Sequence, residues 1–162
     1  MIDLSRVKLV LFDFDDTLCI HSKHWNHDSD GYNKAMFTGD AGWWDRNNCE
    51  YSKEMMKLIT YCRDNDIDMG LISAVELCVT SVTKLAWVKQ KYGVDMKNFC
   101  TTAGQTSKKD MVNYIIRAYG LEADSILFVD DYYHHVSQVA SIGVQAASPM
   151  EVVNWANSKP IK

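Results

Sequence analysis

The sequence lacks several features that mark particular classes of protein. Its 162 residues carry a formal net charge of −4, without the excess of basic residues that binds nucleic acids or acidic membranes. No apolar run approaches the roughly 20 residues that a membrane-spanning helix needs. The N-terminal stretch MIDLSRVKLV has no apolar segment long enough for a signal peptide. We therefore expect a cytoplasmic protein with no membrane partner.

The cysteines form no recognisable pattern. Their number is odd, their spacing is irregular and no CxxC pair occurs, the five being Cys19, Cys49, Cys62, Cys78 and Cys100. Several lie inside apolar runs, where a reduced cysteine behaves as a small hydrophobic residue. We expect neither a disulfide framework nor a zinc site, and a reducing compartment fits this cysteine usage.

The composition is that of an ordinary globular protein, with 47% apolar and 23% charged residues. The length fits one domain with a sizeable core, spanning residues 1–162. Short apolar runs predict four strands, at residues 7–12, 67–73, 125–129 and 142–147. The first and third runs are nearly continuous in Val, Leu, Ile and Phe, as in strands covered on both faces.

Apolar residues at helical spacing predict helices between and after these strands, over residues 51–65, 75–93, 108–120, 132–143 and about 149–157. Gly120 is a typical helix stop, and Ser148 with Pro149 is a typical helix start. Strands that alternate with helices predict an α/β fold, a Rossmann-like three-layer α/β/α arrangement with a central parallel sheet. Ligands of such sheets bind beyond the carboxyl ends of the strands.

Residues 18–50 interrupt this alternation with a polar segment rich in Gly, Asn, Asp and His. Such a segment is too long for an idle connection within a compact domain, and long loops are usually functional. It contains the pair Trp43 and Trp44, for which two interpretations stay open. The pair stacks on a base or aromatic ring of a substrate, or it is the hydrophobic anchor of the long loop.

The histidines fall into two groups. His21, His24 and His27 repeat every three residues, but this spacing suits a metal-ligand set on a helix, and the surrounding residues disfavour a helix. We interpret them as polar loop groups, with substrate contact as the alternative. His134 and His135 follow an acidic pair at the start of a helix. We interpret them as part of a solvated helix turn, with the approach of one of them to the site as the alternative.

Aspartates collect where two predicted strands end. Asp13, Asp15 and Asp16 follow the first strand in LVLFDFDDTL, and Asp130 and Asp131 follow the third. Carboxylates that converge at one edge of a sheet raise each other's pKa and destabilise the fold unless something compensates. A hard divalent cation with oxygen ligands is the natural compensation, and Mg²⁺ suits a site of few carboxylates plus a substrate phosphate.

Four motifs in this order resemble the haloacid dehalogenase superfamily, in its phosphatase branch. They are 13-DFDDT-17, 70-GLIS-73, 107-SKK-109 and 127-LFVDD-131. The resemblance covers nearly the whole chain. Among the small members without a cap domain, the chain resembles most the magnesium-dependent phosphatases.

The resemblance implies a role for each residue of the first two motifs. Asp13 is the nucleophile that forms an aspartyl-phosphate, and Asp15 is the general acid and then the general base. Thr17 hydrogen-bonds locally and holds Asp15 in place. Ser73 donates a hydrogen bond to the phosphoryl oxygens, and Ala74 belongs to the same substrate-binding segment.

A lysine is implied to neutralise the phosphate and the aspartyl group. Lys108 and Lys109 are adjacent, and only one of them can point into the site. We favour Lys108 because it follows the expected cap Ser107, where the helix N-terminus also attracts a phosphate.

The resemblance also implies the ligands of Mg²⁺. They are Asp13, the backbone carbonyl of Asp15 and the later acidic pair, in which we favour Asp131 as the direct ligand with Asp130 close behind. Asp16 occupies a variable position of the motif and is expected to contribute only its backbone.

The expected function is Mg²⁺-dependent hydrolysis of a phosphate monoester. The insertion at about residues 18–50 is long enough for a flap or small lid, but not for a full cap domain. The expected partner is a phosphorylated small molecule, a phosphoprotein or a nucleic-acid end. An open site favours a substrate with bulk of its own, or else a partner subunit that closes the site in a homo-oligomer. The alternatives are a nucleic-acid 3′-phosphatase, a phosphotransferase and a non-catalytic binding module of the same fold.

Overall fold

The computed structural model describes residues 2–21, 29–40, 42–46, 49–75, 77–102 and 105–158. Trp25, His24 and His27 lie outside the described residues, so the interpretation of these two histidines stays a prediction. No helix in the described ranges has the length and apolar character needed to cross a membrane.

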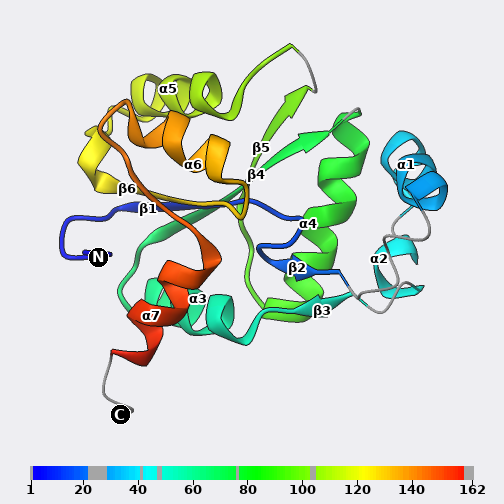
Figure 1. Cartoon of the computed structure of the whole chain (residues 1–162), viewed down its shortest axis with the longest axis horizontal. Coiled ribbons are helices and arrows are strands. Elements are labelled where there is room, and N and C mark those ends of the chain that lie inside the picture. Colours follow the sequence, from blue (N-terminus) through cyan, green and yellow to red (C-terminus); the bar gives the residue numbers. More distant parts are fainter. Residues whose placement is uncertain are drawn as a thin grey trace.

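A five-stranded parallel sheet forms the centre of the fold (Figure 1). Its order is β5-β4-β1-β6-β7, with β1 at Leu9–Phe12, β4 at Asp68–Val75, β5 at Lys97–Thr102, β6 at Ile126–Val129 and β7 at Gln145–Ala147. Every residue of β1 and β6 is buried, as their continuous apolar sequences predict. Phe12 at the end of β1 lies opposite Leu71 in β4 and Val129 in β6. The segments that follow these three positions therefore meet at one edge of the sheet.

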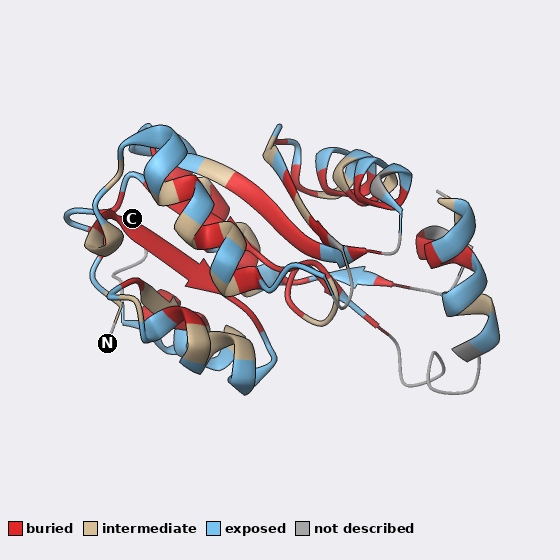
Figure 2. Cartoon of the chain, turned by 90° about the horizontal axis from the view of Figure 1, so that it is seen from above, coloured by how far each residue is buried: buried red, intermediate tan, exposed pale blue. Residues whose placement is uncertain are grey.

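Helices cover both faces of the sheet, which confirms the predicted three-layer α/β/α fold. The helices are α3 at Lys53–Asp64, α4 at Cys78–Tyr92, α5 at Lys108–Tyr119, α6 at Tyr133–Ala140 and α7 at Pro149–Asn157. Figure 1 shows α5 and α6 above the sheet and α3 and α7 below it. Two separate clusters of buried side chains match these two layers. In Figure 2 buried strands lie between helices whose outer faces are exposed.

The ends of the helices follow the sequence signals. The hydroxyl of Ser107 accepts a hydrogen bond from the backbone N–H of Asp110 at the start of α5. Gly120 ends that helix with a φ of 61°, a conformation that glycine adopts without strain. Ser148 forms a capping box with Glu151 ahead of α7. These caps fix where α5, which carries Lys108, begins.

Strand β5 was not predicted, because its sequence KNFCTT has few apolar residues and alternates in burial at the edge of the sheet. Its Phe99 packs over Gly70 of β4, where an added Cβ would lie 2.6 Å from a ring carbon of Phe99. Strand β4 itself continues to Val75, so Ser73 lies within the strand and not at its end.

The insertion after β1 forms two short strands and two helices, namely β2 at Cys19–Ile20, α1 at Ser29–Thr38, α2 at Gly42–Arg46 and β3 at Glu50–Tyr51. Strands β2 and β3 pair antiparallel at the base of the insertion. Helix α1 lies beside α4 in Figure 1, and Thr80 of α4 donates a hydrogen bond of 2.5 Å to the carbonyl of Met36. Trp43 and Trp44 are buried, with exposed fractions of 4% and 0%. They anchor the insertion and present no ring face to a substrate, so the structure favours the anchor of the two alternatives.

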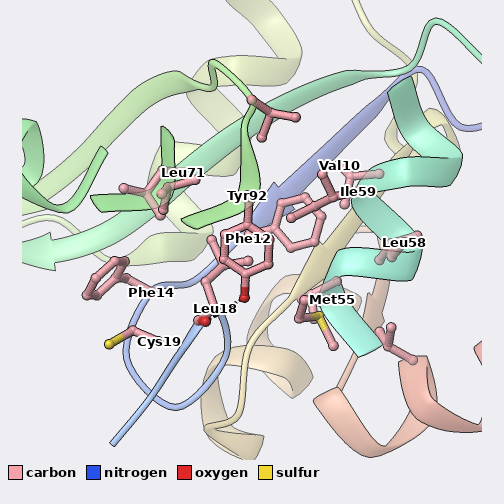
Figure 3. Packing of buried hydrophobic residues seen from close by; sticks show 14 of the residues in the cluster. Val10, Phe12, Phe14, Leu18, Cys19, Met55, Leu58, Ile59, Leu71 and Tyr92 are labelled. Atoms are coloured by element: carbon pink, nitrogen blue, oxygen red, sulfur yellow. Dashed lines mark hydrogen bonds between the residues drawn. The ribbon is translucent and has the colours of Figure 1, made fainter. Parts of the chain in front are cut away.

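Tyr92 fastens the loop after β1 to the body of the fold. Its hydroxyl donates to the carbonyl of Leu18 at 2.6 Å and accepts from the backbone N–H of Ser52 at 2.9 Å. Figure 3 shows the Tyr92 hydroxyl directed toward Leu18, with Phe12 and Phe14 packed nearby. A single buried hydroxyl therefore links this loop to the N-cap of α3.

We expect Tyr92→Phe to lower the free energy of unfolding by about 1–2 kcal/mol, because it removes both bonds from buried backbone groups. Tyr114→Phe is the matched control, since Tyr114 is 59% exposed, and we expect it to change stability by less than about 0.5 kcal/mol. Urea unfolding measures both variants. Equal stabilities would show that the Tyr92 hydroxyl does not secure the loop.

Candidate active site

Lys108 lies between two buried carboxylates at the centre of the sheet edge. Its Nζ is 2.5 Å from Asp13 Oδ1, just after β1, and 2.6 Å from Asp130 Oδ2, just after β6. The backbone N–H of Asp13 donates to the carbonyl of Val129, so the two strand ends are held together. Lys109 instead donates to the Ser141 hydroxyl at the surface. Of the two candidate lysines, the structure places Lys108 in the site.

This arrangement leaves an excess of negative charge. Burial raises the pKa of Asp13 to about 7; the positive charge of Lys108 opposes this shift, while the nearby Asp130 and Asp15 add to it. Burial alone would lower the pKa of Lys108, but the charges of Asp13 and Asp130 outweigh it and raise that pKa. Partial burial and the neighbouring Asp130 raise the pKa of Asp131. One ammonium group therefore faces three acidic side chains.

The acidic side chains are close enough to share one cation. Carboxylate oxygens of Asp13, Asp130 and Asp131 all lie within 4.8 Å of one another. Mg²⁺ binds oxygen at roughly 2 Å, so opposite ligands of one ion lie about 4 Å apart. These residues fit a magnesium ion in number, chemistry and spacing. The carboxylate of Asp15 is not part of this cluster, and its predicted backbone contribution stays a prediction.

The two aspartates after β6 differ in surroundings. Asp130 is fully buried and accepts from the backbone N–H of Tyr132 at 2.9 Å, whereas Asp131 is exposed. The Asp131 N–H donates to the hydroxyl of Thr17 at 3.1 Å. Thr17 was expected to hold Asp15, but its hydroxyl instead joins the loop after β1 to the loop after β6. Thr17 thus positions Asp131 relative to Asp13.

Asp15 has its own set of partners. Lys84 Nζ lies 2.6 Å from Oδ2, His21 Nε2 lies 2.8 Å from Oδ1, and the Tyr32 hydroxyl donates to Oδ2 at 3.1 Å. Burial would raise the pKa of Asp15, but the charge of Lys84 and the hydrogen bonds from His21 and Lys84 outweigh it and hold that pKa well below its usual range. Asp15 is therefore a carboxylate in this structure.

Asp16 lies beside this set and turns the chain. Its φ is 53°, a left-handed conformation that aspartate tolerates better than most residues. Its backbone N–H donates to the carbonyl of Cys19, and its side chain accepts from the N–H of His21 at 3.2 Å. Asp16 thus contributes its side chain to the turn as well as its backbone.

Lys84 is the site residue that the sequence analysis missed. Its side chain is fully buried, and Nζ also donates to the Ser73 hydroxyl at 3.0 Å. The ammonium lies 4.9 Å from the ring centre of Phe14 and 5.3 Å from that of Trp44, within range of cation–π attraction. Lys84 therefore connects Asp15 to the predicted phosphate-binding serine.

The wrong face of α4 was chosen from the sequence, which explains the omission. Apolar spacing in residues 75–93 predicts a buried stripe of Val75, Cys78, Val82, Leu85 and Ala86, but Val82 is 58% exposed. The face that the structure buries is more polar and consists of Thr80, Ser81, Lys84, Trp87 and Val88. Their spacing of three and four residues is itself helical, and the buried polar members concealed it.

Two histidines contact the acidic groups, and of the two alternatives for His134 and His135 the structure favours the approach of one of them, His135. The side chain of His21 is 1% exposed and bonded to Asp15, so it is not a solvated loop group. Burial works against its charged form, but the hydrogen bonds with Asp15 and Cys49 raise the pKa of His21 to about 9. His135 Nδ1 lies 3.2 Å from Asp130 Oδ2, whereas His134 contacts Gln138 at the surface. Burial and the charge of Lys108 lower the pKa of His135.

Ser73 and Ala74 differ within β4, since Ser73 is buried beside Lys84 and Ala74 is exposed. A hollow of about 510 Å³ lies elsewhere, lined by residues that include Lys8 before β1 and Asp68 at the start of β4. It is at the amino ends of the strands, opposite the acidic cluster. The acidic cluster and Lys108 lie instead at the carboxyl edge of the described sheet.

We expect Lys84→Met to destabilise the protein by about 3 kcal/mol, because it leaves the half-buried Asp15 without its closest cation, itself fully buried. Lys89→Met on the same helix is the control. Lys89 pairs with Asp95 at the surface, with both side chains largely exposed, and its loss is expected to cost less than about 1 kcal/mol. Denaturant unfolding at neutral pH measures both variants. Equal losses would refute the importance assigned to the buried pair.

Sequence comparisons with family models and with curated proteins give no match. Many solved structures match instead. A HAD-like family hydrolase from Porphyromonas gingivalis is 13% identical, with 96% of this chain and all of that chain covered and a TM-score of 0.56. A HAD family enzyme from Bacteroides thetaiotaomicron, in complex with magnesium and inorganic phosphate, is 11% identical, with 88% and 93% of the two chains covered and a TM-score of 0.56.

A third match is the N-terminal part of a Bacteroides fragilis protein, which contains a phosphatase domain complexed with Mg. It is 14% identical with a TM-score of 0.60, and the match covers 94% of this chain but only 41% of that chain. The chain also spans 64% of a hypothetical protein from Xanthomonas campestris. Identities this low establish the fold and not the chemistry. The chain has the fold of the haloacid dehalogenase hydrolases, without a full cap domain in the part that the structure describes.

Proposed function

We propose that this chain is a Mg²⁺-dependent phosphatase that hydrolyses a phosphate monoester through an aspartyl-phosphate on Asp13. The observation that carries the proposal is the buried contact of Lys108 with both Asp13 and Asp130 at the ends of adjacent strands. A second carboxylate, Asp15, follows two residues later with separate partners. The likeness in fold to hydrolases solved with magnesium and phosphate supports the same reading.

The residues that would hold Mg²⁺ are Asp13, Asp130 and Asp131, together with the backbone carbonyl of Asp15 that the motif resemblance implies. When bound, the ion supplies positive charge that reduces the repulsion between a carboxylate nucleophile and an anionic phosphate.

Asp13 is the proposed nucleophile. One of its carboxylate oxygens forms a bond to phosphorus while the bond from phosphorus to the ester oxygen breaks. Lys108 neutralises charge on the phosphoryl oxygens, helped by the N-terminus of α5, where it is the first residue. The Ser73 hydroxyl, which accepts a hydrogen bond from Lys84, donates its own proton to a phosphoryl oxygen.

Asp15 is proposed to move the protons. It gives a proton to the leaving oxygen and later takes one from the water that attacks the aspartyl-phosphate. The structure holds Asp15 as a carboxylate, which is the form needed for the second step. The first step needs the protonated form. An anionic phosphate close to Asp15 favours protonation, because like charges raise a carboxyl pKa.

The insertion at about residues 18–50 is proposed as a flap or small lid at the side of this site. Its α1 contacts α4, and its Tyr32 and His21 bind Asp15 directly. A lid of this size leaves room for a phosphoprotein, a nucleic-acid end or another bulky phosphate ester, or for a second copy of the chain. The described free cysteines fit the cytoplasmic location that we propose.

We expect Asp13→Asn to lower the hydrolysis of p-nitrophenyl phosphate in Mg²⁺ by about a thousandfold or more, because an amide is not a competent nucleophile. Asp95→Asn is the control, since Asp95 lies at the surface in a pair with Lys89. Circular dichroism checks that both variants fold. Parental turnover in a folded Asp13→Asn variant would rule out the proposed function.

The adjacent lysines offer a second matched pair. We expect Lys108→Met to reduce turnover by about 100- to 1,000-fold, since it removes the cation aimed at the phosphoryl group. Lys109→Met should leave turnover within about twofold, because Lys109 donates a hydrogen bond to the Ser141 hydroxyl at the surface, away from the acidic cluster. Steady-state kinetics with saturating Mg²⁺ compares the turnover of the two variants. A larger loss for Lys109→Met would mean that the wrong lysine has been assigned.

A further inference from the structure

Two cysteines and a histidine meet at the base of the insertion. Cys19 begins β2 and His21 directly follows the strand, so in this extended stretch the two side chains lie on the same side. The pairing of Ile20 with Glu50 brings His21 opposite Cys49, which precedes β3. One ligand atom from each of Cys19, His21 and Cys49 lies within 4.8 Å of the others, and all three residues are buried. Residues from the two ends of the insertion thus form one compact cluster.

The orientation of His21 is that of a metal ligand. Its Nδ1 lies 3.5 Å from Cys49 Sγ, and its Nε2 lies 2.8 Å from Asp15 Oδ1. A histidine that binds a metal through one ring nitrogen usually donates the other N–H to a carboxylate, which fixes the ring and makes the ligand more basic. Asp15 already occupies that second position.

The chemistry of the cluster differs from that of the acidic site. Thiolates and imidazole favour Zn²⁺ and other thiophilic ions, whereas Mg²⁺ favours oxygen ligands. Zinc binds sulfur at about 2.3 Å and nitrogen at about 2.0 Å, so ligand atoms of one zinc ion lie roughly 3.5 Å apart. Atoms already within 4.8 Å need only a small contraction to reach that spacing. The cluster supplies three of the four ligands of a tetrahedral site.

We propose that Cys19, His21 and Cys49 form a zinc site separate from the acidic cluster. Bound zinc would cross-link β2 to the residue before β3 and so hold the two ends of the insertion together. It would also fix the orientation of the His21 imidazole that contacts Asp15. On binding, Cys19, Cys49 and Nδ1 of His21 give up to solvent any protons that they carry, and no electrons are transferred. The proposal does not depend on the phosphatase activity. The irregular cysteine spacing and the lack of a CxxC pair disfavour zinc in the sequence. The cluster forms because the pairing of β2 with β3 brings the distant Cys49 to His21.

The direct test is a titration of the metal-free, phosphine-reduced protein with Co²⁺ in excess Mg²⁺, which saturates the acidic cluster. We expect one equivalent of Co²⁺ to bind with a thiolate-to-cobalt charge-transfer band that Zn²⁺ then abolishes. The band should disappear in Cys49→Ser and persist in Cys100→Ser, whose residue lies in β5 outside the cluster. Cobalt binding without the band, or an unchanged band in Cys49→Ser, would overturn the proposal.

Two further measurements keep the test decisive if Cys49→Ser does not fold. Zinc should raise the melting temperature of the parental protein and of Cys100→Ser. Asp15→Asn should weaken zinc binding by about 10- to 100-fold, as expected for a carboxylate that supports a histidine ligand. A Cys19–Cys49 disulfide in the purified protein, with no zinc bound after reduction, would show that the cluster is a thiol pair and not a metal site.

Discussion

The rest of the site depends on the contact of one buried ammonium with two buried carboxylates. Lys108 bridges Asp13 and Asp130, which adjacent apolar strands carry to the same point. Strands β1 and β6 are buried throughout and pair with each other, so the backbone that carries Asp13 and Asp130 is held in place. The same burial makes the charges costly, so removing Lys108 would leave two carboxylates without their shared cation in a poorly solvated place. That constraint favours a further cation at the remaining oxygens.

A second buried lysine separates the two aspartates of the first motif. Lys84 pairs with Asp15, whereas Lys108 pairs with Asp13. The pKa of Asp15 is lowered from its ordinary value and the pKa of Asp13 is raised. Pairs of carboxyl groups whose surroundings separate their pKa values are typical of acid–base chemistry. The insertion takes part in this separation, because it supplies His21 and Tyr32 to Asp15. The insertion therefore contributes two side chains, His21 and Tyr32, to the surroundings of Asp15.

The sequence was informative where local signals and the fold agree. The buried strands, the caps at Ser107 and Ser148 and the position of Lys108 follow from apolar runs, turn chemistry and motif order. It was misleading where tertiary contacts decide. Strand β5 is half polar, the buried face of α4 carries Lys84, and Cys49 meets His21 only through the pairing of two short strands. No local pattern encodes these contacts, since each depends on residues far apart along the chain.

The most direct test of the account is a crystal structure of the protein with Mg²⁺ and beryllium fluoride, which mimics an aspartyl-phosphate without any need to know the substrate. We expect the beryllium fluoride group to be bound to a carboxylate oxygen of Asp13 and to contact Lys108 and Ser73. The metal ion is expected on Asp13 and the Asp130–Asp131 pair. Beryllium fluoride bound to Asp15 would contradict the assignment of Asp13 as the nucleophile. So would a metal ion at the acidic cluster with no beryllium fluoride on Asp13.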